Sequence, residues 1–423
     1  RAALTPGEIV SAVDALPAEA VLAHPDVLVE QARALAALGA REQERSVLDR
    51  AERLVQQPTA AFARAIETQR AAAVMYSGDA DAARHRADAV LAAAGPGEER
   101  TIARALAVSG IAAAWAAQRP EATRALTRAT ELFTSVGEPH QAAVASVQLG
   151  FGVELHEDLR VAERTFDRAV RLAAGDDRSR AMALTYRGET RAWLGRRDES
   201  AADFGEALGL ARIVRDARAE GYAAWGLALV ASLEGDAART RAFAEAAERA
   251  LSEWSDTLVG LTFVAGIADI LDRAGATADA DAMLARAVAR RDELSDMVGL
   301  SELAITARRG DPHLVEAMWS ALSDDPGIEP FERLRCGVLR AYAALRRDDP
   351  AVAELRAAAL HDADVMGLGD FPATMERVAW EALEMWAAAT DGTWEVHCLG
   401  PLEVTRGGIV VDVDRLVDVL LQF

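Results

Sequence analysis

Residues 184–211, LTYRGETRAWLGRRDESAADFGEALGLA, form two amphipathic segments on either side of a Leu-Gly-Arg-Arg turn. Counted from Gly188, Ser200, Phe204 and Ala207 follow at offsets of 12, 16 and 19 residues. Small residues let two paired helices approach closely, and the Phe one turn further on fills the gap to the next pair. This stretch therefore predicts one helix-turn-helix unit.

The same spacing recurs along the chain. Residues 146–173 and 107–132 place equivalent residues at the same offsets, in the sets Gly150, Ala162, Phe166, Ala169 and Gly110, Ala122, Leu126, Ala129. The marker position near the start of the second helix repeats every 35 to 40 residues, at Glu44, Ala83, Ala122, Ala162, Ser200, Thr240, Ala280, Val315 and Ala353. This period predicts nine helix-turn-helix units.

Turn signals lie five residues before the marker, where glycine relieves backbone strain between antiparallel helices. They are found at Gly39, Gly78, Gly195, Gly235, Gly275 and Gly310. Each unit alone leaves an apolar face exposed, and stacking buries it. We therefore expect an all-α, right-handed superhelix whose concave surface is lined by the first helix of every pair.

Leu149-Gly150 followed by Ala162, Phe166 and Ala169 resembles the tetratricopeptide (TPR) repeat. The period near 39 is longer than the usual 34 residues. Units of this length resemble the helical-repeat sensor domains of MalT-like, LuxR-type activators and of antibiotic-regulatory-protein-type transcriptional activators. The resemblance covers roughly residues 20–365 and implies a TPR-like α-solenoid, whose domain we expect to span residues 1–390. It also implies an upstream nucleotide-binding module that would drive oligomerisation.

Near its end the chain changes character. Residues 394–413, WEVHCLGPLEVTRGGIVVDV, alternate apolar and polar positions around Gly-Pro and Gly-Gly turns, which predicts a short β-hairpin segment. The stretch resembles the opening hairpin of the OmpR/PhoB-type winged-helix domain through Leu399, Gly400, Pro401, Leu402, Glu403 and Val404, with Gly407 and Gly408 at the turn. The resemblance implies a partial winged-helix DNA-binding domain at 393–423. The alternative is a hairpin that caps the solenoid.

Composition excludes several classes of function. All 46 basic residues are Arg, so neither a P-loop nor a Schiff-base lysine can lie in this stretch. The net charge of −21 argues against DNA binding by the stretch itself, because DNA affinity depends on clustered cations. No apolar run reaches the roughly 20 residues of a membrane span, so we predict a cytoplasmic protein without a membrane partner.

Catalytic motifs are absent from the sequence. It contains no HExxH, no GxSxG and no GxGxxG after a strand, and its seven His residues lack metal-ligand spacing. The two cysteines, Cys336 and Cys398, lie far apart and support neither a disulfide framework nor a zinc site. We predict a protein that is not an enzyme and that needs no cofactor or metal.

Binding is the remaining class of function. First-helix positions one turn apart should face the concave side, and in the central repeats they hold Trp115, Phe151, Glu154, Glu189, Trp193, Tyr222 and Trp225. Aromatic rings with interspersed carboxylates are typical of a wall that binds a sugar or a peptide. The alternative for Trp115 and Trp193 is that each fills a gap between repeats.

These patterns lead to two hypotheses. In the first, the chain is the sensor and protein-interaction domain of a transcriptional regulator. Its groove would bind a small-molecule inducer or a partner protein or peptide, and the complete C-terminal domain would bind promoter DNA, with homo-oligomerisation left open. In the second, the chain is a TPR-like scaffold that docks a partner protein or peptide and has no DNA role.

Overall fold

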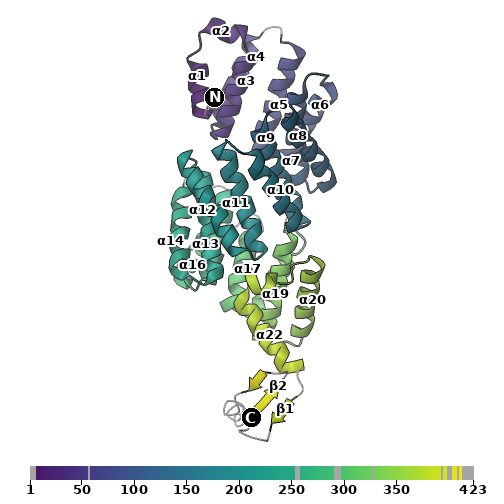
Figure 1. The fold of residues 1–423 in the computed structure, drawn as a ribbon, viewed down its shortest axis with the longest axis vertical. Helices are drawn as coiled ribbons and strands as arrows, with labels where there is room; N and C mark the ends of the chain where they lie inside the picture. Colours follow the sequence, from purple (N-terminus) through teal and green to yellow (C-terminus); the bar gives the residue numbers. More distant parts are fainter. Residues whose placement is uncertain are drawn as a thin grey trace. The chain divides into compact units, whose positions relative to one another are not determined.

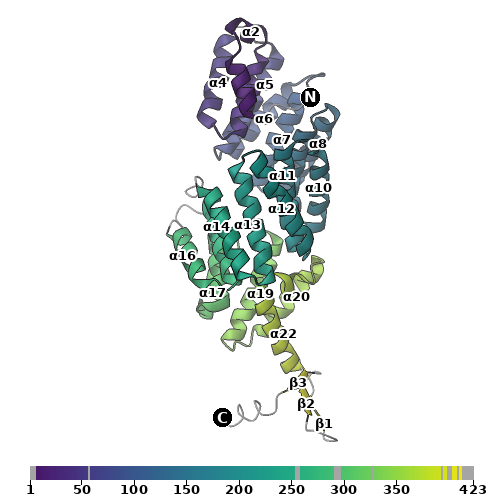
Figure 2. The ribbon, with the colours of Figure 1, turned by 60° about the vertical axis from the view of Figure 1, so that its left-hand side comes forward.

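The structure, a computed structural model, describes residues 6–55, 58–252, 258–289, 297–325, 328–391, 394–397, 403–406 and 409–411. The chain divides into two compact units, and the division falls within three consecutive helices. Unit 1 comprises Arg1–Arg191 and Asp198–Gly226, and unit 2 comprises Ala192–Arg197 and Leu227–Phe423. Figures 1 and 2 show the helices of both units, coloured along the sequence.

Antiparallel helix pairs make up the repeats. The helices up to the unit boundary are α1 (Pro6–Asp14), α2 (Ala18–Ala23), α3 (Asp26–Ala37), α4 (Arg41–Leu54), α5 (Ala60–Tyr76), α6 (Ala80–Ala93), α7 (Glu99–Trp115), α8 (Arg119–Ser135), α9 (Pro139–Gly152), the 3₁₀ helix η1 (Glu154–His156), α10 (Leu159–Leu172), α11 (Asp177–Trp193), α12 (Arg197–Ile213) and α13 (Ala217–Glu234). Each odd-numbered helix from α3 to α13 is the first helix of a pair.

The pattern continues in unit 2 and ends in three strands. The remaining elements are α14 (Ala237–Ala250), α15 (Leu258–Arg273), α16 (Thr277–Val288), α17 (Met297–Arg309), the 3₁₀ helix η4 (Pro312–Leu314), α18 (Val315–Leu322), α19 (Pro330–Arg346), α20 (Val352–Val365), α21 (Phe371–Met375), α22 (Arg377–Asp391), β1 (Trp394–His397), β2 (Glu403–Arg406) and β3 (Ile409–Val411). Within the described residues, the pairs from α3/α4 to α19/α20 are the nine predicted units, and the TPR-like α-solenoid fold is confirmed.

The marker position is buried in eight of the nine pairs. The first eight predicted marker residues, from Glu44 to Val315, are fully buried. The ninth prediction was wrong by one residue, because Ala353 is exposed and Val352 is buried in its place. The helix α20 begins only at Val352, after Pro350, and this late start shifts the buried face by one position.

The turns within the pairs are closed by backbone hydrogen bonds. At Gly39 the amide donates to Ala36, and the next amide, of Ala40, donates to Leu35, which is the Schellman arrangement at a helix C-terminus. Five of the six predicted turn glycines have a positive φ, as this arrangement requires. Gly310 is the exception, since its φ is not in the left-handed region and its amide donates to Thr306 in an ordinary helical bond.

Glycines in the first helices let aromatic rings lie against the backbone. A Cβ on Gly150 would lie 2.5 Å from Cε1 of Phe166, and a Cβ on Gly226 would lie 2.1 Å from Cε1 of Phe204. Both rings are fully buried. The predicted Gly and Phe spacing is therefore a packing contact that holds neighbouring helices at backbone distance.

The C-terminal strands pair as the alternation predicts. They form an antiparallel sheet in the order β1-β2-β3, with Val396 opposite Val404 and Val404 opposite Val411. Most residues that carry the winged-helix resemblance, namely Leu399, Gly400, Pro401, Leu402, Gly407 and Gly408, lie outside the described residues, as do 393, 398 and 412–423 of the predicted segment. The sheet therefore agrees with a hairpin, and its assignment to a winged helix stays a prediction.

We expect Gly226→Ala to destabilise unit 1 by about 1–3 kcal/mol, because the new methyl group must displace the buried Phe204 ring. Chemical denaturation followed by circular dichroism measures this change. Gly209→Ala in α12 is the matched control, since a Cβ there meets nothing within 4 Å. It should stabilise the helix by about 0.5–1 kcal/mol. Equal effects of the two substitutions would contradict the packing role.

Candidate functional site

The seven residues predicted to line a binding wall divide between the two units. Unit 1 contains Trp115, Phe151, Glu154, Glu189, Tyr222 and Trp225. Unit 2 contains Trp193. The structure therefore places these side chains in two separate environments.

Trp115 and Phe151 form an exposed aromatic surface in unit 1. They lie at the C-terminal ends of α7 and α9, and these ends touch, since a Cβ on Gly152 would lie 3.0 Å from Cβ of Ala114. The Trp115 side chain is 53% exposed and that of Phe151 is 40% exposed. On its other side Phe151 packs against Tyr186 of α11, with 5.1 Å between the ring centroids. The surface thus extends over three successive first helices.

Glu154 adds a carboxylate directly after α9. It lies in the 3₁₀ helix η1, half-buried, and its Oε2 atom has no hydrogen-bond partner among the described residues. Burial raises its pKa, a hydrogen bond with Thr165 lowers it, and the charge of Glu157 raises it. A buried acceptor without a partner is costly, so a ligand that donates a hydrogen bond here would relieve that cost.

Glu189 and Tyr222 lie close together on α11 and α13, and both are half-buried. Arg218 donates a hydrogen bond of 3.0 Å to the Tyr222 hydroxyl, and its guanidinium lies 5.2 Å from the ring centroid. Burial raises the pKa of Tyr222, Arg218 lowers it, and the charge of Glu189 raises it again. Trp225, one turn further along α13, is also half-buried. These three side chains are held by their neighbours more firmly than Trp115.

Trp193 is a packing residue in this structure. Its side chain is only 7% exposed. The ring lies 4.7 Å from that of Phe331 and 6.3 Å from that of Phe371, measured between centroids. The alternative interpretation, in which Trp193 fills a gap, therefore describes it better than a place on an open wall.

A cluster of buried charges in unit 2 was not predicted from the sequence. Its members come from α15, α17, α19 and the residue before α22, and we call them the arginine cluster: Arg273, Arg308, Arg309, Arg335, Asp269, Asp272, Glu332 and Glu376. Four cations face four carboxylates, so the cluster is neutral as a whole. The Arg309 side chain is 35% exposed and that of Arg308 is 13% exposed. The other six side chains are at most 10% exposed.

Glu376 is the centre of the arginine cluster. Arg308 donates to both of its oxygens, at 2.9 and 2.8 Å, and Arg335 donates to Oε1 at 2.7 Å. Burial by itself would raise the pKa of Glu376, but the charges of Arg308, Arg335 and Arg273 outweigh burial and lower it. The carboxylate is therefore ionised although its side chain is only 2% exposed.

One sequence signal could have located this cluster. Arg273 and Arg308 lie seven residues before Ala280 and Val315, which is also the offset of Trp115 from Ala122 and of Trp193 from Ser200. The same helical position thus carries an exposed Trp, a buried Trp and two buried Arg residues in different repeats. An Arg at a helical position that carries a Trp in other repeats indicates that the side chains around it include carboxylates that can pair with it.

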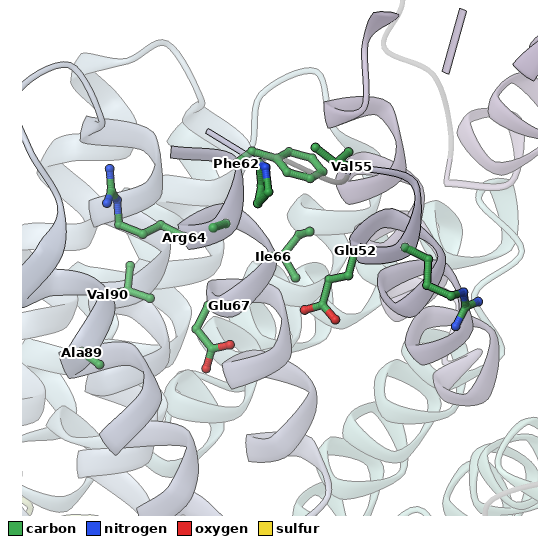
Figure 3. A pocket seen from close by; sticks show the side chains of 11 residues that line it. Glu52, Val55, Phe62, Arg64, Ile66, Glu67, Ala89 and Val90 are labelled. Atoms are coloured by element: carbon green, nitrogen blue, oxygen red, sulfur yellow. The ribbon is translucent and has the colours of Figure 1, made fainter. Parts of the chain in front are cut away.

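A hollow lies among the earlier helices of unit 1. It has a volume of about 800 Å³ and opens between α4, α5 and α6. Figure 3 shows Val55 and Phe62 together at one end, and Glu52 and Glu67 at the other. Its two carboxylates are engaged, since Arg70 binds Glu52 at 2.9 Å and Arg86 binds Glu67 at 2.6 Å. The aromatic surface is the better candidate because its two large rings are exposed.

Comparison with known proteins supports the fold. No family model matches the sequence, and no curated protein sequence matches it. Among solved structures, a Rap protein complexed with competence and sporulation factor is similar over 88% of this chain and 99% of its own, with a TM-score of 0.54 and 12% identity. Yeast Tom70 aligns over 91% and 93% of the two chains with a TM-score of 0.38 and 13% identity. The Rap match confirms the helical-repeat architecture.

None of the helices in the described part of the chain has both the length and the apolar character of a membrane span.

Replacing each of the two equivalent tryptophans should separate packing from binding. We expect Trp193→Ala to lower the free energy of unfolding by about 3–5 kcal/mol, because it empties a buried aromatic cluster. Trp115→Ala should change it by less than about 0.5 kcal/mol, because that ring is exposed. Urea titrations of both variants give the comparison, and a large loss for Trp115→Ala would show that this ring is structural.

Glu154→Gln should stabilise the protein at neutral pH. The folded-state pKa of Glu154 is raised, so the folded protein holds this proton more tightly than the unfolded chain and loses stability as pH rises through the raised pKa. The amide has no such penalty. The gain should shrink as pH falls through the raised pKa toward the ordinary carboxyl pKa, which thermal unfolding from pH 4 to pH 8 would reveal. A gain that is independent of pH would contradict this assignment.

Proposed function

We propose that this chain is a protein-interaction module that binds a peptide segment of a partner on the first-helix face of unit 1. The observation that carries the proposal is the aromatic surface of Trp115 and Phe151, whose rings are 53% and 40% exposed at touching helix ends. Large exposed aromatic side chains are the usual anchors of protein interfaces, because they bury much area at a small cost in conformational entropy.

The charges around this surface indicate what the peptide should carry. Glu154 has an unpartnered oxygen, and Glu189 lies on the next first helix. A basic or hydrogen-bond-donating group next to an apolar side chain would satisfy the carboxylate and cover the rings together. The Rap protein, which has the same fold, was solved complexed with a factor, and this supports a binding role for such a repeat array.

A second candidate is the sensor domain of a transcriptional regulator of the MalT/LuxR or antibiotic-regulatory type. The three-stranded antiparallel sheet over residues 394–411 favours it, because a winged-helix domain of the OmpR/PhoB type would open with such strands. In this candidate the bound peptide or small-molecule inducer would control promoter binding by the complete C-terminal domain. The first candidate, the protein-interaction module, requires no DNA binding. Both candidates include the docking of a partner.

Selection from a random peptide display library tests the proposal directly. We expect peptides that combine an aromatic or aliphatic residue with a basic residue, and we expect Trp115→Ala with Phe151→Ala to weaken them at least tenfold, as anchor residues do. Ile213→Ala is the matched control, since that side chain is 70% exposed at the end of α12 and outside the surface. Selected peptides that bind equally to all three proteins would place the site elsewhere.

A further inference from the structure

Residues 366–376 join α20 to α22, and we call them the strap. The strap contains the five-residue helix α21. It contacts the end of α11 and the turn that follows it, and residues of α17 and α19. Phe371 packs against Trp193 and Phe331, Thr374 Oγ1 lies 3.3 Å from the position of a Cβ on Gly195, and Glu376 binds Arg308 and Arg335. The strap thus contacts this face through an aromatic group and a carboxylate.

We propose that the first-helix face of unit 2 is a docking site for a partner segment that carries an aromatic residue and, five positions later, an acidic residue. The strap occupies this site as an internal ligand and is displaced when the partner binds. The inference concerns unit 2 and does not depend on the function proposed for unit 1.

The carboxylate half of the site has the geometry of a recognition site. Arg308 offers two parallel donors to Glu376, and Arg335 adds a third donor from another helix. Such forked contacts are specific for carboxylates, since the planar guanidinium matches both oxygens. All three side chains are at most 13% exposed, so water competes little with the contact.

Arg273 gives the site capacity for a further acceptor. Its Nη2 atom donates to Asp269 at 3.1 Å, whereas its Nε and Nη1 atoms have no hydrogen-bond partner among the described residues. Its side chain is 10% exposed, and burial lowers its pKa. Arg273 lines a hollow of about 220 Å³ together with Tyr342, Thr374 and Arg377. The strap therefore satisfies this site incompletely, and a partner with a second acceptor would satisfy it better.

The aromatic half of the site is formed by Trp193 and Phe331, whose centroids are 4.7 Å apart. Phe371 completes this group at 6.3 and 6.5 Å from the two rings. Aromatic contacts at these distances are favourable but tolerate exchange of one ring for another. An aromatic side chain of a partner can therefore take the place of Phe371.

The strap can leave while its neighbours stay in place. Gly367, with a φ of +64°, and Gly369 lie at its start, so the backbone can turn there without strain. Beyond the strap, α22 has contacts of its own, because Arg356 of α20 binds Glu384 at 2.7 Å and lies over the Trp380 ring. A helix of five residues such as α21 is not stable when detached. Release therefore converts the strap into a flexible loop between two fixed helices.

The test uses the full chain with Phe371→Ala and Glu376→Gln, which empties both halves of the site. The probe is a fluorescein-labelled peptide of residues 366–377, MGLGDFPATMER. In fluorescence anisotropy it should bind this variant at least about tenfold more tightly than the unaltered protein, where the strap competes for the same site. A peptide with Gln in place of Glu should bind the variant at least about tenfold more weakly, because it loses the charged contact.

The matched control is Val378→Ala with Met385→Ala, two exposed side chains of α22 that leave the strap intact. This control should bind the probe as weakly as the unaltered protein. A double variant that folds, as judged by circular dichroism and cooperative unfolding, but does not bind the probe overturns the proposal. Equal binding of the Glu and Gln peptides does so as well.

Hydrogen exchange of the unaltered protein decides the matter if the double variant does not fold. The amides of Phe371, Thr374 and Glu376 donate within the strap, at 2.9, 3.0 and 3.0 Å, so they are protected only while it is closed. We expect them to exchange at least about tenfold faster than the amides of α19, because the strap opens without global unfolding. Exchange as slow as that of α19 would show that the strap is a fixed part of the core.

Discussion

The close approach of paired helices at the marker position is the constraint on which both units depend. Ser200 is fully buried there, and its hydroxyl donates a 2.6 Å hydrogen bond to the carbonyl of Gly188. In the first helix pair, α3/α4, Glu44 occupies the marker position. Gln69 donates a hydrogen bond to one of its oxygens and Arg41 donates to the other. The position therefore accepts a larger polar residue only where neighbours satisfy it, because an unpaired polar group at full burial is costly.

Periodicity predicted the helix pairs because packing repeats with the sequence. Gly150 and Phe166, or Gly188 and Phe204, carry their partner at a fixed offset, so one sequence is enough to find them. The shift from Ala353 to Val352 and the ordinary φ of Gly310 were missed because each depends on the local start of a second helix. Contacts between distant repeats, such as Arg308 with Glu376, have no period and could not be predicted.

The arginine cluster has a different physical role from the apolar core around it. Burying three of the four cations and the four carboxylates requires large desolvation, which their mutual attraction only roughly offsets, and apolar residues of the same size would hold the helices as well or better. What the charges add is specificity, because Arg308 and Arg335 accept a carboxylate at one position and in one orientation. The cluster is therefore better explained by recognition of Glu376 than by stability.

The equivalent tryptophans show how one repeated scaffold gives two kinds of surface. Trp115 and Trp193 lie at the same offset before their markers, yet the first is 53% exposed and the second 7% exposed. The difference comes from Phe331 and Phe371, which cover Trp193 and belong to sequence far from its own repeat. Exposure at this repeated position is thus set by segments outside the repeat.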